Sequence, residues 1–355
     1  MSEPTNHYGP TAARPPGRPG RELRPAGLTV DVHSHVLVPE AAHFVAPHLD
    51  PATIPLARFA VPETQALNRK QEADRRRVFT DLAARLAELD AMGLDMQVCA
   101  PPPPQCYYTV PLEPAVRATR MVNDGIAAFC AERPDRFVGL GSVPMQDAAA
   151  AVEELERCVG RLGFKGVQVL TNVAGRELSD PAFAPFWAKA EALGALVMLH
   201  PNGFTEGQRL SRFYFNNVIG NPLETTIALH YLIFDGVLER HPDLKILAVH
   251  GGGYLPAYSG RIDHAWGARS DARGGLPKPP TYYLRKVYFD SIVFTPHQLE
   301  YLVRVFGPNR ILMGTDFPFD MAEADPIGHV AAVEALDDTM RAAIAGGNAQ
   351  RLLGL

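Results

Sequence analysis

Short apolar runs rich in β-branched residues alternate with longer stretches of helical periodicity from residue 28 to the end of the chain. Apolar residues at three- and four-residue intervals indicate amphipathic helices, and the short continuous apolar runs indicate buried strands. The expected strands are 28–32, 96–100, 137–142, 166–170, 196–200, 245–250, 287–290 and 311–315. The main helices between them are expected at 81–92, 113–132, 148–162, 181–193, 222–240 and 296–306. Eight such strand-helix units predict an α/β fold, a TIM-like (β/α)8 barrel rather than an open doubly wound sheet.

Two longer interruptions follow predicted strands one and five, at residues 36–72 and 201–220. Both begin at the carboxyl end of a strand, where barrel enzymes build their sites, so we expect them to line or cover a substrate. Residues 1–27 are rich in Pro, Gly and Arg and lack a hydrophobic period. They predict a flexible N-terminal tail, followed by one barrel domain at residues 28–355.

Composition and charge narrow the class of partner. The chain is 46% hydrophobic and 21% charged, as in ordinary globular proteins, and its formal net charge is −5. A chain without a basic stripe is not expected to bind nucleic acid or an anionic membrane surface. It also lacks an apolar run long enough to span a bilayer and a hydrophobic signal-peptide core, so a cytoplasmic enzyme of small molecules is expected.

Candidate metal ligands lie at the ends of three predicted strands. His33 and His35 are two residues apart on one strand, so their side chains share a face. His200 ends the strand at 196–200, and Asp316 directly follows the strand at 311–315. Because strand ends converge in a barrel, the four side chains predict one divalent metal site. Three imidazoles and a carboxylate suit zinc, with manganese as the alternative.

Two further residues are candidates for proton transfer and for substrate binding. His250 ends the predicted sixth strand and begins an HGGG segment, where an imidazole beside the metal could transfer protons. Arg261 follows that segment and could hold a substrate carboxylate bidentately, although a surface salt bridge explains it almost as well. The cysteines are dispersed and are expected to pack as small hydrophobic residues.

Nine motifs make the chain from about residue 28 resemble the amidohydrolase superfamily. Within it, the chain resembles α-amino-β-carboxymuconate-ε-semialdehyde decarboxylase and related metal-dependent decarboxylases. The motifs are DVHSH at 31–35, RFVGLGSVPMQ at 136–146, LGFKGVQV at 162–169, LHP at 199–201, NPLETTIAL at 221–229, HGGG at 250–253, GRIDH at 260–264, GTDFPF at 314–319 and GNAQRLLGL at 347–355.

The resemblance implies a distorted barrel with one zinc or manganese ion on His33, His35, His200 and Asp316, and acid/base chemistry at His250. It further implies that Arg261 reaches the site of a neighbouring subunit and helps to hold a substrate carboxylate, which predicts a homodimer. The predicted fourth strand, 166–170, lacks the lysine that two-metal relatives carboxylate, so a single ion is expected. Asn202 stands where the decarboxylase has a pocket-lining tryptophan. It is therefore a candidate substrate contact that sets the substrate apart from the decarboxylase's own.

The leading functional hypothesis is cofactor-free, metal-assisted decarboxylation of an aromatic or unsaturated hydroxy or amino carboxylic acid, with proton delivery by His250 or Asp316. The alternative is hydrolysis, as a deaminase, lactonase or amidase, or hydration of a related intermediate of aromatic catabolism, in which the same residues would activate water. A non-catalytic metal-binding barrel would have no use for a proton-transfer residue beside the ligands.

Overall fold

Nine strand segments build the two parallel sheets of the computed structural model, which describes residues 20–355. One sheet has the order β1-β2-β3 and the other the order β11-β10-β9-β8-β5-β4, and a small antiparallel hairpin, β6-β7, stands apart. The strands are β1 (Val30–His35), β2 (Met96–Ala100), β3 (Phe137–Gly139), β4 (Gly141–Ser142), β5 (Gly166–Leu170), β6 (Asn172–Val173), β7 (Arg176–Glu177), β8 (Leu196–His200), β9 (Lys245–Ala248), β10 (Tyr288–Asp290) and β11 (Ile311–Leu312).

The two sheets are continuous parts of one distorted TIM-like barrel. On one side, β3 and β4 are a single stretch of chain interrupted at Leu140. On the other side, the segment after β11 bonds to β1: the Val32 amide donates to the Met313 carbonyl (2.9 Å), and the His35 amide donates to the Phe317 carbonyl (2.8 Å). The strands therefore follow one another in chain order, and the predicted fold class is confirmed.

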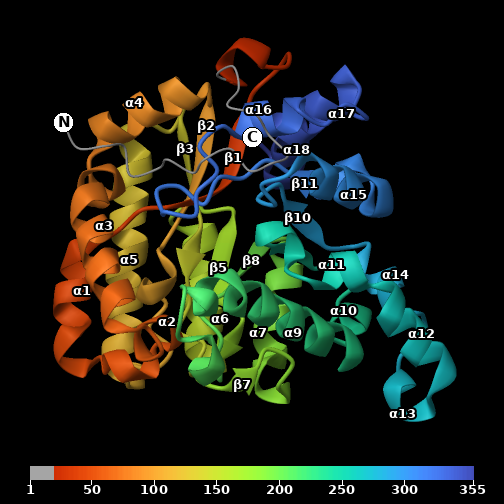
Figure 1. Ribbon diagram of the computed structural model, residues 1–355. Helices are drawn as coiled ribbons and strands as arrows, with labels where there is room; N and C mark the ends of the chain where they lie inside the picture. Colours follow the sequence, from red (N-terminus) through yellow and green to blue (C-terminus); the bar gives the residue numbers. More distant parts are fainter. Residues whose placement is uncertain (1–19) are drawn as a thin grey trace.

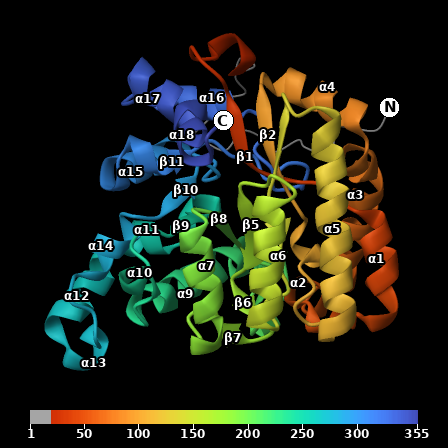
Figure 2. The same ribbon diagram turned by 180° about the vertical axis from the view of Figure 1, so that it is seen from behind.

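Helices cover the outer face of the sheets, and Figure 2 shows α5, α6 and α7 side by side on it. The α-helices are α1 (Pro39–Val45), α2 (Pro55–Arg58), α3 (Pro62–Thr80), α4 (Leu82–Met92), α5 (Leu112–Glu132), α6 (Ala148–Gly160), α7 (Ala184–Ala192), α8 (Phe215–Val218), α9 (Gly220–Phe234), α10 (Val237–Arg240), α11 (Leu255–Tyr258), α12 (Gly260–Ala268), α13 (Ser270–Arg273), α14 (Pro280–Leu284), α15 (Pro296–Phe306), α16 (Pro326–Ala331), α17 (Asp338–Ala342) and α18 (Asn348–Leu353).

Local sequence signals account for several helix boundaries. Asp81 caps α4 by accepting a hydrogen bond from the Ala84 amide (2.7 Å), and Gly93 ends the helix with φ of 77°. The helix expected at 222–240 is instead two helices, because Gly236 adopts φ of 73° between α9 and α10. Strands β9 and β11 are shorter than expected, since the chain turns into left-handed backbone at His250 and Asp316.

The two insertions after β1 and β8 lie against each other. The first contains α1 and α2, and the second contains the 3-10 helix η6 (Gly207–Leu210) and α8. Asn216 of α8 is buried and joins them: its Nδ2 donates to the Pro55 carbonyl (3.0 Å), and its Oδ1 accepts from the Phe204 amide (2.9 Å). We call this side chain the Asn216 clasp.

The segment after β9 departs most from a regular barrel. Figure 1 shows α12 and α13 projecting from the body, far from the strands. Across residues 20–355, no helix is long and apolar enough to cross a membrane. Of the predicted N-terminal tail, residues 1–19 lie outside the described chain, while Gly20–Leu23 form the 3-10 helix η1 and Arg24 bonds to Asp95.

Candidate metal centre

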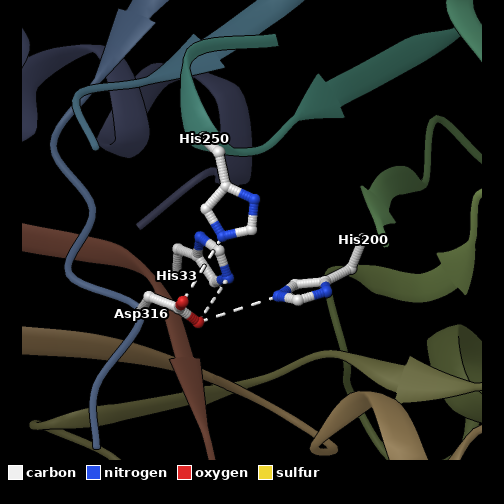
Figure 3. A group of neighbouring side chains, drawn as sticks. All are labelled: His33, His200, His250 and Asp316. Atoms are coloured by element: carbon white, nitrogen blue, oxygen red, sulfur yellow. Dashed lines mark hydrogen bonds and ion pairs between the residues drawn. The ribbon is translucent and has the colours of Figure 1, made fainter. Parts of the chain in front are cut away.

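Side chains from four strand ends gather at one point of the barrel (Figure 3). His33 and His35 belong to the carboxyl end of β1, and His200 is the last residue of β8. His250 follows β9 in the short helix η7 (His250–Gly252), and Asp316 follows β11. Potential ligand atoms of His33, His200, His250 and Asp316 all lie within 4.8 Å of one another.

The Nε2 atoms of three histidines converge on Oδ1 of Asp316. The distances to this oxygen are 3.3 Å from His33, 3.0 Å from His35 and 3.7 Å from His200. Two donors bound to one zinc ion at about 2.1 Å lie roughly 3 to 3.5 Å apart, so the separations from His33 and His35 suit a shared ion, and His200 lies just beyond that range. Nε2 of His200 is buried without a hydrogen-bond partner among the described residues, which leaves a lone pair for a ligand bond.

The opposite ring nitrogen of each of these histidines is fixed by an acceptor. His33 donates from Nδ1 to Asp290 Oδ2 (2.8 Å), and His35 donates to the Pro101 carbonyl (2.9 Å). His200 donates to the Pro201 carbonyl (2.7 Å). Because a carbonyl oxygen has no proton to give, the Nδ1 atoms of His35 and His200 carry the hydrogen and their Nε2 atoms face the centre. Such outer partners orient metal ligands and raise their basicity.

Asp290 is a positioning residue that the sequence reasoning missed. It ends β10, is fully buried, and accepts hydrogen bonds from His33 and from the Gly251 amide (2.8 Å). It thereby ties the first candidate ligand to the HGGG segment. The available signal was a carboxylate at the end of an apolar strand.

His250 differs from the other histidines in its surroundings. Its Nε2 lies 3.3 Å from Oδ2 of Asp316, whereas the other three histidines face Oδ1. Its Nδ1 is buried and has no partner among the described residues, so no outer acceptor fixes the ring as a ligand. Its backbone has φ of 54°, an uncommon value for a residue with a side chain and one concentrated at functional sites.

Charge is unevenly distributed among the side chains of the centre. Burial opposes the charged form of His33, but Asp316 and Asp290 outweigh it and raise its pKa to about 10. Burial lowers the pKa of His200 to about 3 and also lowers the pKa of His35. The pKa of Asp316 lies well below its usual range, because the charge on His33 and hydrogen bonds from the histidines overcome its burial.

A buried network supports the β1 end of the centre from behind. Asp31 accepts from the amide of His33 (3.0 Å) and from Gln97 Nε2 (2.7 Å). Gln97 in turn accepts from Nε of the fully buried Arg85 (2.7 Å), whose Nη1 donates to the His35 carbonyl (2.7 Å). The strand that carries two candidate ligands is thus held on both sides by fully satisfied polar groups, which rigidify a core.

These observations together describe a site for a divalent metal ion. The donors are imidazole nitrogens and a carboxylate oxygen, their separations fit one coordination sphere, and outer hydrogen bonds preset their orientation.

Metal affinity is expected to depend on pH through a single proton. In the metal-free protein His33 is protonated at neutral pH, because its pKa is about 10, while His35 and His200 are neutral. A ligand nitrogen must lose its proton to bind an ion, so affinity should rise about tenfold per pH unit from pH 7 to 9 and level off above the pKa of His33. Chelator competition at constant ionic strength measures this slope. Affinity that does not change with pH, or that rises about a hundredfold per pH unit as for the release of two protons, would contradict this prediction.

The predicted substrate contacts are placed differently. Asn202 is buried two residues beyond His200 and lines a cavity of about 670 Å³. Arg261 is exposed and belongs to α12, the helix that projects from the body in Figure 1. Arg75 is buried near the end of α3. Burial raises the pKa of Asp320, and the positive charge of Arg75 opposes this rise.

Known proteins share this fold and much of the sequence. Residues 24–355 match the amidohydrolase family. The chain is 36% identical over 276 residues to 2-amino-3-carboxymuconate-6-semialdehyde decarboxylase of Dictyostelium discoideum, covering 78% of this chain and 77% of that protein. It is 30% identical over 295 residues to gamma-resorcylate decarboxylase of a Rhizobium species, covering 76% and 86%.

The structural likeness is equally broad. The crystal structure of 5-carboxyvanillate decarboxylase from Sphingomonas paucimobilis superposes with a TM-score of 0.81 at 26% identity, covering 92% of this chain and 99% of that one. The family match spans all the strand ends that build the metal centre. The chain therefore belongs to the amidohydrolase family.

Proposed function

We propose that this protein is a metal-dependent, cofactor-free decarboxylase of an aromatic or unsaturated hydroxy or amino carboxylic acid. The observation that carries the proposal is that the two carboxylate oxygens of Asp316 have different neighbours: three histidines face Oδ1, while His250 faces Oδ2. One oxygen thus belongs to a ligand set and the other to a proton-transfer pair. Decarboxylase relatives at 36% and 30% identity favour a carboxy-lyase over the hydrolase or hydratase alternative.

The proposed ligands of the ion are Nε2 of His33, His35 and His200 and a carboxylate oxygen of Asp316. His35 belongs to the set, rather than His250, because its Nδ1 has an outer acceptor and its Nε2 lies nearest to Oδ1. A nitrogen-rich donor set favours Zn²⁺, with Mn²⁺ as the alternative. When bound, the ion supplies Lewis-acid polarisation of the substrate's oxygen substituents.

His250 and Asp316 would move the proton that decarboxylation requires. When the bond to the carboxylate breaks, its electron pair stays on the substrate carbon, carbon dioxide leaves, and that carbon must accept a proton. The His250 ring is partly accessible and lies 3.3 Å from Asp316 Oδ2, so a proton on Nε2 is held at the centre until substrate approaches.

Elemental analysis combined with an assay of carbon dioxide release tests the function. The panel comprises hydroxybenzoates, aminobenzoates, nitro-aromatic acids and muconate semialdehydes. We expect about one ion per chain and release of carbon dioxide from at least one acid. An ion-loaded enzyme that hydrolyses or hydrates related compounds without releasing carbon dioxide would replace the proposal by its alternative.

We further propose that two copies of the chain form the working enzyme and that Arg261 acts on the substrate of its partner. The exposure of Arg261 on a helix that projects from the body supports this arrangement. Light scattering during size exclusion should give a dimer, and Arg261→Ala should raise KM about tenfold, the cost of losing one charge-assisted contact.

Subunit mixing would separate action across the dimer from action within one chain. Arg261→Ala and His250→Asn chains are combined and allowed to exchange, and rates are measured at a substrate concentration below the wild-type KM, where each variant alone is weakly active. Half of the dimers then carry one site with both residues intact, so about a quarter of wild-type activity should return. No recovery after confirmed exchange would place Arg261 in its own chain's site or outside the chemistry.

A further inference from the structure

Strand β1 is irregular at the point where it carries the first candidate ligand. Asp31 lies opposite Gln97 on β2, but Ser34 lies opposite Cys99, so β1 has one residue more than β2 over this stretch. Such a β-bulge bends a strand, re-aims its side chains and disrupts the ladder locally. At this bulge the His33 amide donates to Oδ1 of the Asp31 side chain (3.0 Å). Asp31 therefore holds the bulge in shape through the backbone of the ligand itself.

Asp31 also bonds to the segment that carries Asp316. Its Oδ1 accepts from the Thr315 amide (3.0 Å), and its Oδ2 accepts from Thr315 Oγ1 (2.6 Å). In addition, the Asp316 amide donates to the His33 carbonyl (2.8 Å). The backbone of His33 is thus tied at its amide and at its carbonyl to the chain around Asp316. Asp31 thereby fixes where the first and the last ligand-bearing segments lie relative to each other.

The hydrogen bonds behind Asp31 run in a fixed direction. Arg85 is fully buried and has only donors, so its Nε must donate to Gln97, and Oε1 of that amide must face Arg85 (2.7 Å). The amide nitrogen Nε2 of Gln97 then faces Asp31 Oδ2 as a donor (2.7 Å). Position 31 consequently requires an acceptor toward Gln97 and a second one toward the amides of His33 and Thr315. A carboxylate accepts at both oxygens, whereas an amide accepts at one and donates at the other.

The guanidinium of Arg85 is itself held in one orientation. Its Nη1 donates to the His35 carbonyl (2.7 Å), and its Nη2 donates to Ser34 Oγ (2.9 Å). The group also lies over the Phe317 ring, 4.9 Å from the ring centre. Because these contacts fix the plane of the guanidinium, they also fix the direction in which the Gln97 amide points.

We propose that Asp31 is a positioning residue of the metal centre and that Arg85 acts on it through Gln97. Asp31 sets the separation of His33 and Asp316 without touching the ion or the substrate. The fixed orientation of Arg85 makes a carboxylate necessary at position 31 as long as Gln97 lies between them. The assignment concerns the geometry of the metal centre, and it holds whether the ion serves decarboxylation or the hydrolytic alternative.

Exchanging the two kinds of side chain tests this coupling. Asp31→Asn places an amide nitrogen against a donor whichever way the new amide turns, and Gln97→Glu places two carboxylates against each other. Each single variant should bind Co²⁺, a probe ion for zinc sites, about 10- to 100-fold more weakly than wild type, the usual cost of losing an outer partner. The double variant Asp31→Asn/Gln97→Glu matches donors to acceptors again, because the new carboxylate accepts from both Arg85 and the new amide. It should bind Co²⁺ within about threefold of wild type, as expected for coupled neighbours.

Two measurements on each variant separate positioning from general stability. Chelator competition gives the affinity for Co²⁺, and the visible spectrum of bound Co²⁺ reports its coordination geometry. The single variants should shift the spectrum, and the double variant should return it to that of wild type. Asp147→Asn is the matched control, since Asp147 caps α6 by accepting from the Ala150 amide (2.9 Å), a bond that an amide oxygen accepts equally well. It should leave affinity and spectrum unchanged.

Thermal unfolding of the metal-free forms shows which variants fold. If a single variant does not fold, the double variant still decides, because a folded double variant with wild-type affinity and spectrum supports the coupling. Wild-type affinity in Asp31→Asn would overturn the positioning role. A double variant that does not fold, or whose loss equals the product of the two single losses, would overturn the coupling through Gln97. Neither result depends on carbon dioxide release, so failure of the proposed function is distinguished from failure of this assignment.

Discussion

The His250→Asn variant is expected to keep its metal ion and lose about a thousandfold in kcat, within the usual range for a general acid or base. Asparagine is chosen because it tolerates the left-handed backbone found at this position better than alanine does. The variant removes the group that faces Asp316 Oδ2 and leaves the three nitrogens around Oδ1 untouched. Elemental analysis checks the metal content, and initial rates of carbon dioxide release from the same preparation check the loss of kcat.

The same experiment decides between His250 and His35 as the fourth ligand. Loss of the ion from His250→Asn would move His250 into the ligand set. A rate near wild type with full metal content would remove its proton-transfer role. His297→Asn is the control, since His297 is exposed on α15 and lies outside the cluster.

His33→Ala is expected to lose the metal ion and the activity together. In the proposed ligand set His33 supplies one nitrogen, and its Nδ1 also donates the hydrogen bond that Asp290 accepts. The change would therefore remove a bond to the ion and leave a buried carboxylate oxygen unpaired. Loss of a mere outer partner weakens metal binding by about 10- to 100-fold, so loss of a ligand should exceed about 100-fold.

Metal titration by chelator competition and activity with excess Zn²⁺ or Mn²⁺ measure this effect. Thermal unfolding of the metal-free forms separates it from misfolding, because a folded His33→Ala chain that binds no ion is the expected result. Asp316→Ala should behave in the same way. Full metal occupancy in either variant would show that the ion binds elsewhere.

The metal centre was predictable because its members occupy strand ends. Strands β2, β5 and β8 have the bounds expected from their apolar runs, and His200 is the last residue of β8 as expected. In a barrel, carboxyl ends of strands converge whatever the intervening loops do. A histidine at the end of a strand can therefore be placed at the centre from the sequence alone, without knowing how distant segments pack.

Asp290 and Arg75 were harder to assign, for a physical reason. Asp290 stands at a strand end like a ligand, yet its carboxylate meets Nδ1 of His33. The difference between coordinating an ion and orienting a ligand is a few ångströms of side-chain placement, which periodicity does not encode. The burial of Arg75 depends on how α3 packs against the segment around Asp320, a contact between residues far apart in the chain.

The Asn216 clasp has a consequence for the kinetics of the enzyme. It bonds one insertion through the Pro55 carbonyl and the other through the Phe204 amide, and both insertions line the cavity. Neither insertion can swing outward while both bonds persist. Ligand exchange at this cavity is therefore expected to require a concerted opening that separates two segments 161 residues apart in the chain, rather than the motion of a single hinged loop.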